Sequence, residues 1–159
     1  MNIFHLDNCP QKAAEFNINK HVVKIPLEIS QMLSTCFHLQ SDLQPKYKPT
    51  HINHPMNVWV RETKENFIWV SEHGIALCHE YTKRYNKTHS CQTVIEWCLS
   101  NIHNVLFTLI NFTNPPLCMP DDVKCNDYVE SYRNYYRKYK VYDKRGVLMA
   151  KWPNKPYWW

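Results

Sequence analysis

The chain has 159 residues, of which 44% are hydrophobic and 21% are charged, and its formal net charge is +5. This composition supports one domain of ordinary size with a substantial core, and it excludes a disordered tail or a collagen-like repeat. Glycine is scarce, with only Gly74 and Gly146, which argues against a Rossmann or Walker phosphate loop and excludes a GxSxG nucleophile elbow.

The first forty residues are predicted to form two helices. Asn8 can cap a short helix that has Pro10 in its opening turn. Asn19 can cap a second helix that runs to about Leu39, and Pro26 should bend it or remove one backbone hydrogen bond. Apolar residues recur at helical spacing along the second helix, at Val22, Ile25, Ile29, Met32, Leu33, Cys36 and Phe37.

The rest of the chain is also predicted to be mainly helical. Residues 41–53 are loop-like, after which Pro55 can open a short helix through Val60 and Thr63 can cap a long one through about Tyr85. A further helix is expected over 89–103. Because few segments alternate with a period of two, we predict an all-α fold, a single compact helical domain over residues 1–159.

The C-terminal region, residues 128–159, differs from the rest in charge and in aromatic content. It follows a Pro-rich connection (111–122), and Asp127 can cap a Tyr-rich helix at its start, whereas 152–159 holds two prolines and is expected to be extended. Eight basic and two acidic residues give it a net charge of +6. Basic side chains neutralise phosphates and aromatic rings stack on bases, so this region predicts a nucleic-acid surface. Its candidate contacts are Arg133, Arg137, Lys140, Trp152, Tyr157 and Trp158.

A structural alternative for the Tyr-rich helix stays open. Val129, Tyr132, Tyr136 and Tyr139 recur at the spacing of a helical core stripe. In that case the helix would pack on the core and its Lys and Arg residues would only be solvated.

A polar stripe on the second helix carries the candidate chemistry. Its members recur at spacings of three and four, opposite the apolar stripe, at His21, Lys24, Glu28, Gln31 and Thr35. A carboxylate beside a cation on a rigid helix suits general acid–base catalysis or the stabilisation of a cationic intermediate. An ordinary solvated helix face is the alternative.

Histidines and cysteines are predicted to have mainly structural roles. His51 and His54, just before the helix at Pro55, could contact an anion. They could also ligate a metal, but no Cys or carboxylate lies at a recognised metal-ligand spacing. The seven cysteines form no CxxC pair, and without a signal peptide or a membrane span we expect reduced, mostly buried thiols in a cytoplasmic protein. No metal or cofactor is expected.

Several segments resemble a family of small proteins from tailed bacteriophages. They are MNIFHLD at the start, KHVVK followed by Glu28, and NHPMNVWVR at 53–61. The ending, MPDD…YRNYYRKYK…W, continues the same pattern, so the resemblance covers nearly the whole chain and implies a phage origin.

A more distant resemblance is to the pyrimidine-dimer DNA glycosylases of the endonuclease V type. His21 and Glu28 reproduce the seven-residue spacing of the His and the essential Glu in that family, and the turn at 53–55 and the aromatic, basic C-terminus are similar. The resemblance implies that the N-terminal amine, on Met1 or on Asn2 after Met removal, attacks C1′ of the damaged nucleotide. The base leaves, a Schiff base forms and β-elimination nicks the strand.

The same resemblance implies roles for side chains around the amine. Glu28 would be the acid/base, and His21 and Lys24 would hold phosphate or sugar. An Arg precedes the Glu in that family where this chain has Leu27, so Lys24 or Arg61 would take its part, and His54 would join the DNA contacts.

The main hypothesis is therefore a DNA N-glycosylase/AP lyase that acts on a damaged or modified base in duplex DNA and extrudes a nucleotide. The alternatives are a non-catalytic phage protein that binds a nucleotide, DNA or a host factor, and a structural protein whose basic tail only aids solubility.

Overall fold

A computed structural model describes residues 1–143 and 145–159, and within them the fold is all-α, as predicted. The α-helices are α1 (Pro10–Glu15), α2 (Asn19–Gln40), α3 (Pro55–Glu62), α4 (Lys64–Tyr85), α5 (Gln92–Ser100) and α6 (Tyr128–Tyr135). Two 3₁₀ turns, η1 (Ile102–Asn104) and η2 (Asp121–Val123), and a π-helical turn, η3 (Tyr136–Lys140), complete the secondary structure. None of the helices in the described part is long and apolar enough to cross a membrane.

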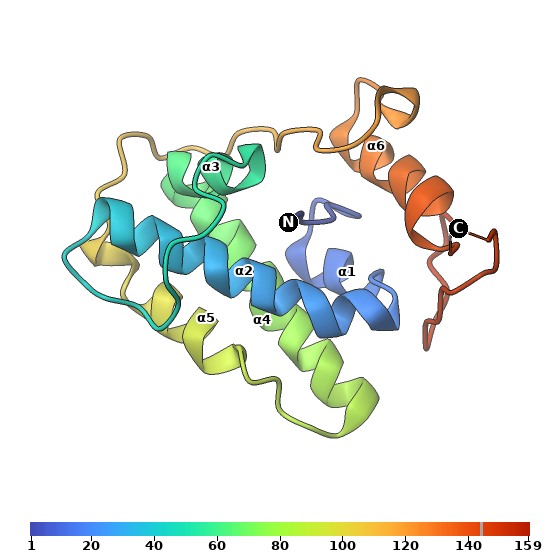
Figure 1. The fold of residues 1–159 in the computed structure, drawn as a ribbon, viewed down its shortest axis with the longest axis horizontal. Coiled ribbons are helices and arrows are strands. Elements are labelled where there is room, and N and C mark those ends of the chain that lie inside the picture. Colours follow the sequence, from blue (N-terminus) through green and yellow to red (C-terminus); the bar gives the residue numbers. More distant parts are fainter. Residues whose placement is uncertain (144) are drawn as a thin grey trace.

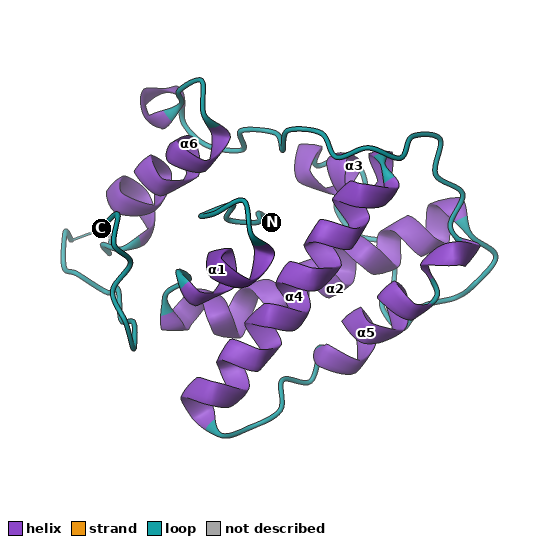
Figure 2. Cartoon of the chain, turned by 180° about the vertical axis from the view of Figure 1, so that it is seen from behind, coloured by secondary structure: helices purple, strands orange, loops and turns teal. Residues whose placement is uncertain are grey.

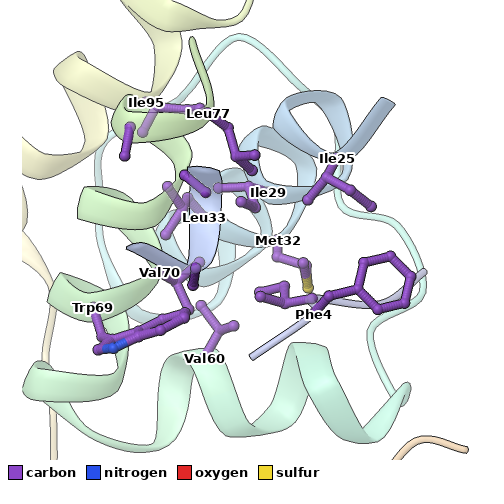
Figure 3. Packing of buried hydrophobic residues seen from close by; sticks show 14 of the residues in the cluster. Phe4, Ile25, Ile29, Met32, Leu33, Val60, Trp69, Val70, Leu77 and Ile95 are labelled. Carbon is purple, nitrogen blue, oxygen red and sulfur yellow. The ribbon is translucent and has the colours of Figure 1, made fainter. Parts of the chain in front are cut away.

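The core forms where α2 and α4 cross, with α1, α3 and α5 packed around them (Figure 1). Figure 3 shows Ile29 and Leu33 of α2 near Val70 and Leu77 of α4, while Met32 lies beside Phe4 of the chain start. The helices approach closely at Gly74, where an added Cβ would lie 2.9 Å from an Ile29 methyl carbon. The apolar stripe predicted on the second helix is therefore the core face of α2.

Two of the predicted helix caps are confirmed. Thr63 Oγ1 accepts a hydrogen bond from the Asn66 N–H at 3.0 Å at the start of α4. Asp127 Oδ1 accepts from the Glu130 N–H at 2.8 Å at the start of α6. Each satisfies a backbone donor that the first helical turn leaves free.

The predictions that Asn8 and Asn19 cap helices are wrong, because both residues form hydrogen bonds with distant parts of the chain instead. Cys9 is the N-cap of α1, while Asn8 accepts hydrogen bonds from the Trp69 indole (2.8 Å, at its carbonyl) and the Tyr128 hydroxyl (2.6 Å, at its side chain). Asn19 is the first residue of α2 rather than its cap. Its side-chain oxygen accepts instead from the Arg84 guanidinium at 3.1 Å.

Two other helix predictions are confirmed in part. Helix α2 continues through Pro26, whose missing N–H leaves one carbonyl of the preceding turn without its helical partner. The predicted helix over 89–103 is shorter, Gln92–Ser100, and is followed by η1. The segment 152–159 forms bends and turns without regular structure, and it packs back on the body through Trp152, whose indole donates to the Phe16 carbonyl at 2.7 Å.

The chain start and the C-terminal region meet on one side of the helical body. A long connection, 105–127, passes α3 and leads to α6, and the N-terminus lies between α2 and α6 in both views (Figures 1 and 2). Phe4 bridges these parts, because its ring stacks on His21 of α2 at 4.6 Å and meets Tyr136 edge-on at 5.1 Å.

All seven cysteines are free thiols. Cys36 of α2, Cys78 of α4 and Cys98 of α5 are fully buried, and burial raises the pKa of each to about 12. A thiol with so high a pKa is a poor nucleophile at neutral pH, so these residues act as core hydrophobes.

Candidate active site

A cavity of about 350 Å³ lies between the chain start, α2 and the C-terminal region. We call it the Glu28 cavity. Its lining residues are Met1, Asn2, Phe4, Lys20, His21, Lys24, Ile25, Glu28, His54, Cys118, Tyr135, Tyr139, Lys140 and Met149. Segments far apart in the sequence therefore build one concave, largely polar site.

The Glu28 carboxylate is surrounded by donors from two segments. Its Oε2 accepts a hydrogen bond from the Asn2 backbone N–H at 2.8 Å and lies 3.9 Å from the α-amine of Met1. Its Oε1 lies 3.1 Å from Lys24 Nζ, one helical turn away. The Glu28 side chain is only 12% exposed, so the carboxylate faces the cavity rather than bulk solvent.

The side chain of Asn2 anchors the chain start in this position. Its Nδ2 donates to the Cys118 carbonyl at 2.9 Å, and its Oδ1 accepts from the Ile3 N–H at 2.9 Å. The hydroxyl of Tyr132 approaches the same oxygen at 3.4 Å and donates to the Pro116 carbonyl at 2.8 Å. The connection before α6 and the buried face of α6 thus hold the amine against Glu28.

His21 is a neutral, oriented group at the cavity wall. Burial, followed by the positive charges of nearby lysines, lowers its pKa from 6.5 to about 3. Its Nδ1 lies 2.7 Å from the Tyr136 hydroxyl, which also accepts from the Ile18 N–H at 2.9 Å. Since the Tyr136 proton is then free to point at His21, Nδ1 is the acceptor and Nε2 carries the proton.

His54 caps α3, and this cap determines its tautomer. Its Nδ1 accepts a hydrogen bond from the Met56 N–H at 3.2 Å, so the neutral ring carries its proton on Nε2. Burial, and then the positive charge of the α-amine, lowers the pKa of His54 below its ordinary value. The ring is therefore a neutral hydrogen-bond donor in the cavity at neutral pH.

Cations and aromatic rings form the rest of the wall. Lys20 and Lys24 lie on α2, and Lys140 lies on η3 with its Nζ 4.6 Å from the Tyr135 ring centre. Three lysines beside aromatic rings create a positive, partly apolar surface. Such a surface can neutralise phosphates and stack on a nucleobase.

Some residues predicted to join the site have partners elsewhere. Arg61 donates from Nη1 to the Ile52 carbonyl at 2.8 Å and does not line the cavity. Arg133 is 13% exposed, donates to the Leu6 carbonyl and forms an ion pair with Asp7 at 3.4 Å. The prediction that Arg61 could replace the family's Arg thus lacks support, and the cation beside Glu28 is Lys24.

The remaining predicted DNA contacts form a separate cluster around the chain end. Arg137 donates to the Trp158 carbonyl at 2.8 Å and pairs with Glu130 at 2.8 Å. Tyr157 is 77% exposed. Trp152, Tyr157 and Trp158 lie outside the cavity lining.

The polar stripe on α2 is only in part the face that the sequence predicts. His21 and Thr35 are buried, whereas Lys24 is exposed. Lys20 was missed, although it lies one turn before Lys24 and could have been added to the stripe. Cys118 and Met149 had no sequence signal, because they reach the cavity from irregular segments.

Among the described residues, no group of three or more His, Cys, Asp or Glu side chains is placed to hold a metal ion. What the cavity offers is an amine, a carboxylate, two neutral imidazoles and three lysines. This set can carry out covalent catalysis through an amine with proton transfer to a carboxylate.

Comparison with known proteins identifies the class. A family model described as pyrimidine dimer DNA glycosylase matches residues 1–93, which include α1 to α4 and the Glu28 half of the cavity. The chain belongs to this family. No curated protein matches the chain at a significant level, and no solved structure does.

Proposed function

We propose that this protein is a DNA glycosylase with lyase activity that acts on pyrimidine dimers through its N-terminal amine. The observation that carries the proposal is the contact between the chain start and Glu28 inside a cationic, aromatic cavity. Membership of the pyrimidine dimer DNA glycosylase family supports pyrimidine dimers as the substrate. DNA is the partner, and a host-cell cytoplasm is the location that a phage origin would imply.

The amine is the nucleophile in this proposal. It attacks C1′ of the damaged nucleotide, the glycosidic bond breaks, and the resulting Schiff base allows β-elimination of the 3′ phosphate. The α-amine of Met1 is 3.9 Å from Glu28 Oε2. If Met1 is removed, the nitrogen of Asn2, 2.8 Å from the same oxygen, becomes the amine. Either nitrogen is within reach of the carboxylate, and intact-mass measurement tells which one reacts.

Glu28 is assigned two tasks. Its carboxylate takes the proton that the amine must lose, and its negative charge stabilises the cationic sugar. Lys24, 3.1 Å from the other oxygen, orients the carboxylate and is exposed enough to contact a phosphate. Lys20 and Lys140 supply further phosphate contacts around the cavity.

His54 and His21 are assigned hydrogen-bonding rather than charged roles. Because Nδ1 of His54 is occupied by the Met56 N–H, this ring donates from Nε2 to a sugar or phosphate oxygen and does not act as a base. His54→Asn provides a test, since Asn is a strong N-cap that lacks the ring. We expect unchanged thermal stability and slower turnover.

The decisive experiment is borohydride trapping on duplex DNA that holds a single cyclobutane pyrimidine dimer. The unmodified protein should form a covalent adduct, and N-terminal acetylation should abolish it. Glu28→Gln should reduce single-turnover cleavage by about 10²-fold or more while duplex binding persists. Glu62→Gln is the matched control, because Glu62 is exposed at the end of α3 and does not line the cavity.

A different outcome would favour the non-catalytic alternative. The enzymatic proposal is wrong if the protein with a free N-terminus forms no adduct and Glu28→Gln binds and processes DNA as the wild type does. The protein is then a DNA binder without catalytic activity. DNA binding that is absent or insensitive to salt would remove the nucleic-acid role altogether.

A further inference from the structure

A short hairpin follows η3 and borders the Glu28 cavity, within the red segment of Figure 1. The Met149 N–H donates to the Val141 carbonyl at 2.7 Å, and the Asp143 N–H donates to the Val147 carbonyl at 2.8 Å. Tyr142 and Leu148 form an antiparallel bridge. The two arms are therefore held in register by backbone hydrogen bonds.

The Asp143 side chain links residues across the turn of this hairpin. Asp143 Oδ1 accepts from the Arg145 N–H at 2.8 Å and from the Val147 N–H at 2.9 Å. Gly146 has a φ of 77°, in the left-handed region that glycine adopts without strain. These hydrogen bonds tie Arg145 and Val147 to Asp143.

The returning arm of the hairpin carries exposed apolar side chains. Val147 is 54% exposed, Leu148 55% and Met149 37%, whereas Val141 on the opposite arm is fully buried. Exposure of apolar surface to water is unfavourable, and a contiguous exposed patch often marks an interaction site. Met149 also lines the Glu28 cavity, so this arm of the hairpin reaches the cavity edge.

The charges around these apolar side chains indicate what kind of partner they contact. Arg145 and Lys151 are exposed beside the patch, and Lys140 lies in the cavity wall. After Glu130, Asp143 is the only acidic residue in the sequence, and it is paired with Arg145 at 2.9 Å. Apolar side chains among cations fit duplex DNA, in which phosphates flank stacked bases.

We propose that Val147 and Leu148 form a wedge that enters the base stack of duplex DNA beside the nucleotide held in the Glu28 cavity. Extrusion of a nucleotide leaves a gap in the stack. Apolar side chains inserted at that step replace the lost base contacts and bury the exposed patch. This inference rests on the proposed function for its ligand, DNA, but it requires no chemistry at Glu28.

The test compares stacked with unstacked DNA. The probes are a dimer-containing duplex with 2-aminopurine next to the lesion, and the same dimer strand without its complement. Leu148→Ala should lower duplex affinity by about tenfold or more, the size expected for one lost apolar side chain, and should reduce the 2-aminopurine signal. Affinity for the single strand should stay unchanged, because no gap has to be filled.

Two further variants and the adduct assay make the result interpretable. Leu148→Met should restore duplex binding, and Leu106→Ala, at a site 78% exposed and outside the cavity, should behave as wild type. Three results for Leu148→Ala would refute the wedge. They are an equal loss of affinity for both probes, no loss of affinity for either probe, and a loss of self-association instead of DNA binding. If wild type forms the adduct and Leu148→Ala behaves identically on all probes, the wedge alone fails. If the 2-aminopurine signal depends on Leu148 but no borohydride-trapped adduct forms, the wedge is supported and the glycosylase proposal is contradicted. If the protein does not bind DNA, both proposals are wrong.

Discussion

The hydroxyl of Tyr136 connects the C-terminal region to the start of α2, and its removal tests that connection. Tyr136 is fully buried on η3. Its oxygen accepts from the Ile18 N–H at 2.9 Å and lies 2.7 Å from His21 Nδ1. Tyr136→Phe preserves the ring and its packing, but it leaves one buried donor and one buried acceptor without a partner.

The size of the effect follows from these two groups. A buried polar group that loses its partner costs about 1–3 kcal/mol, so the two together should destabilise the protein by roughly 2–6 kcal/mol. With a urea m-value of about 2 kcal/mol/M, the unfolding midpoint should fall by about 1–3 M.

Urea unfolding followed by circular dichroism measures this shift. Tyr85→Phe is the control, because Tyr85 is partly exposed and its hydroxyl has no hydrogen-bond partner among the described residues. Nitrogen NMR of the His21 ring adds a direct readout, since Nε2 should carry the proton in the wild type. An unchanged midpoint in Tyr136→Phe, or a proton on Nδ1, would refute the arrangement.

Two other predictions concern stability. Burial lowers the pKa of His21 to about 3 and that of His73 to about 4. The unfolded chain therefore binds protons below about pH 6.5 that the folded chain does not, so these two groups should leave stability constant above that pH and lower it by roughly 5 kcal/mol at pH 4.5. Urea midpoints measured across this range check the sign, and a stability that rises on acidification would contradict it. Gly74→Ala should lower stability by about 1–3 kcal/mol, because the new methyl would lie 2.9 Å from both Ile29 and Ile95. A thermal midpoint equal to or above that of the wild type would contradict this prediction, since it would mean that α2 and α5 shift to accommodate the methyl group at no cost.

The sequence predicts the helices well because their signals are local. The apolar spacing along α2, the Thr63 cap and the Asp127 cap each depend on a few neighbouring residues, and each appears in the structure. The predictions of caps at Asn8 and Asn19 were wrong because long-range contacts, rather than local ones, determine the conformation of those residues. Contacts with Trp69 and other distant partners decide what those side chains bind, and no local pattern encodes such contacts.

Glu28 and His21 could be singled out from the chain alone, since a seven-residue spacing places them on one side of a helix. Only the tertiary structure decided what surrounds them. It placed the Asn2 nitrogen 2.8 Å from Glu28, buried His21 against Tyr136 and gave Arg133 an internal partner in Asp7. Helical periodicity determines which side chains share a face, whereas packing between segments a hundred residues apart determines which of those faces becomes a cavity wall.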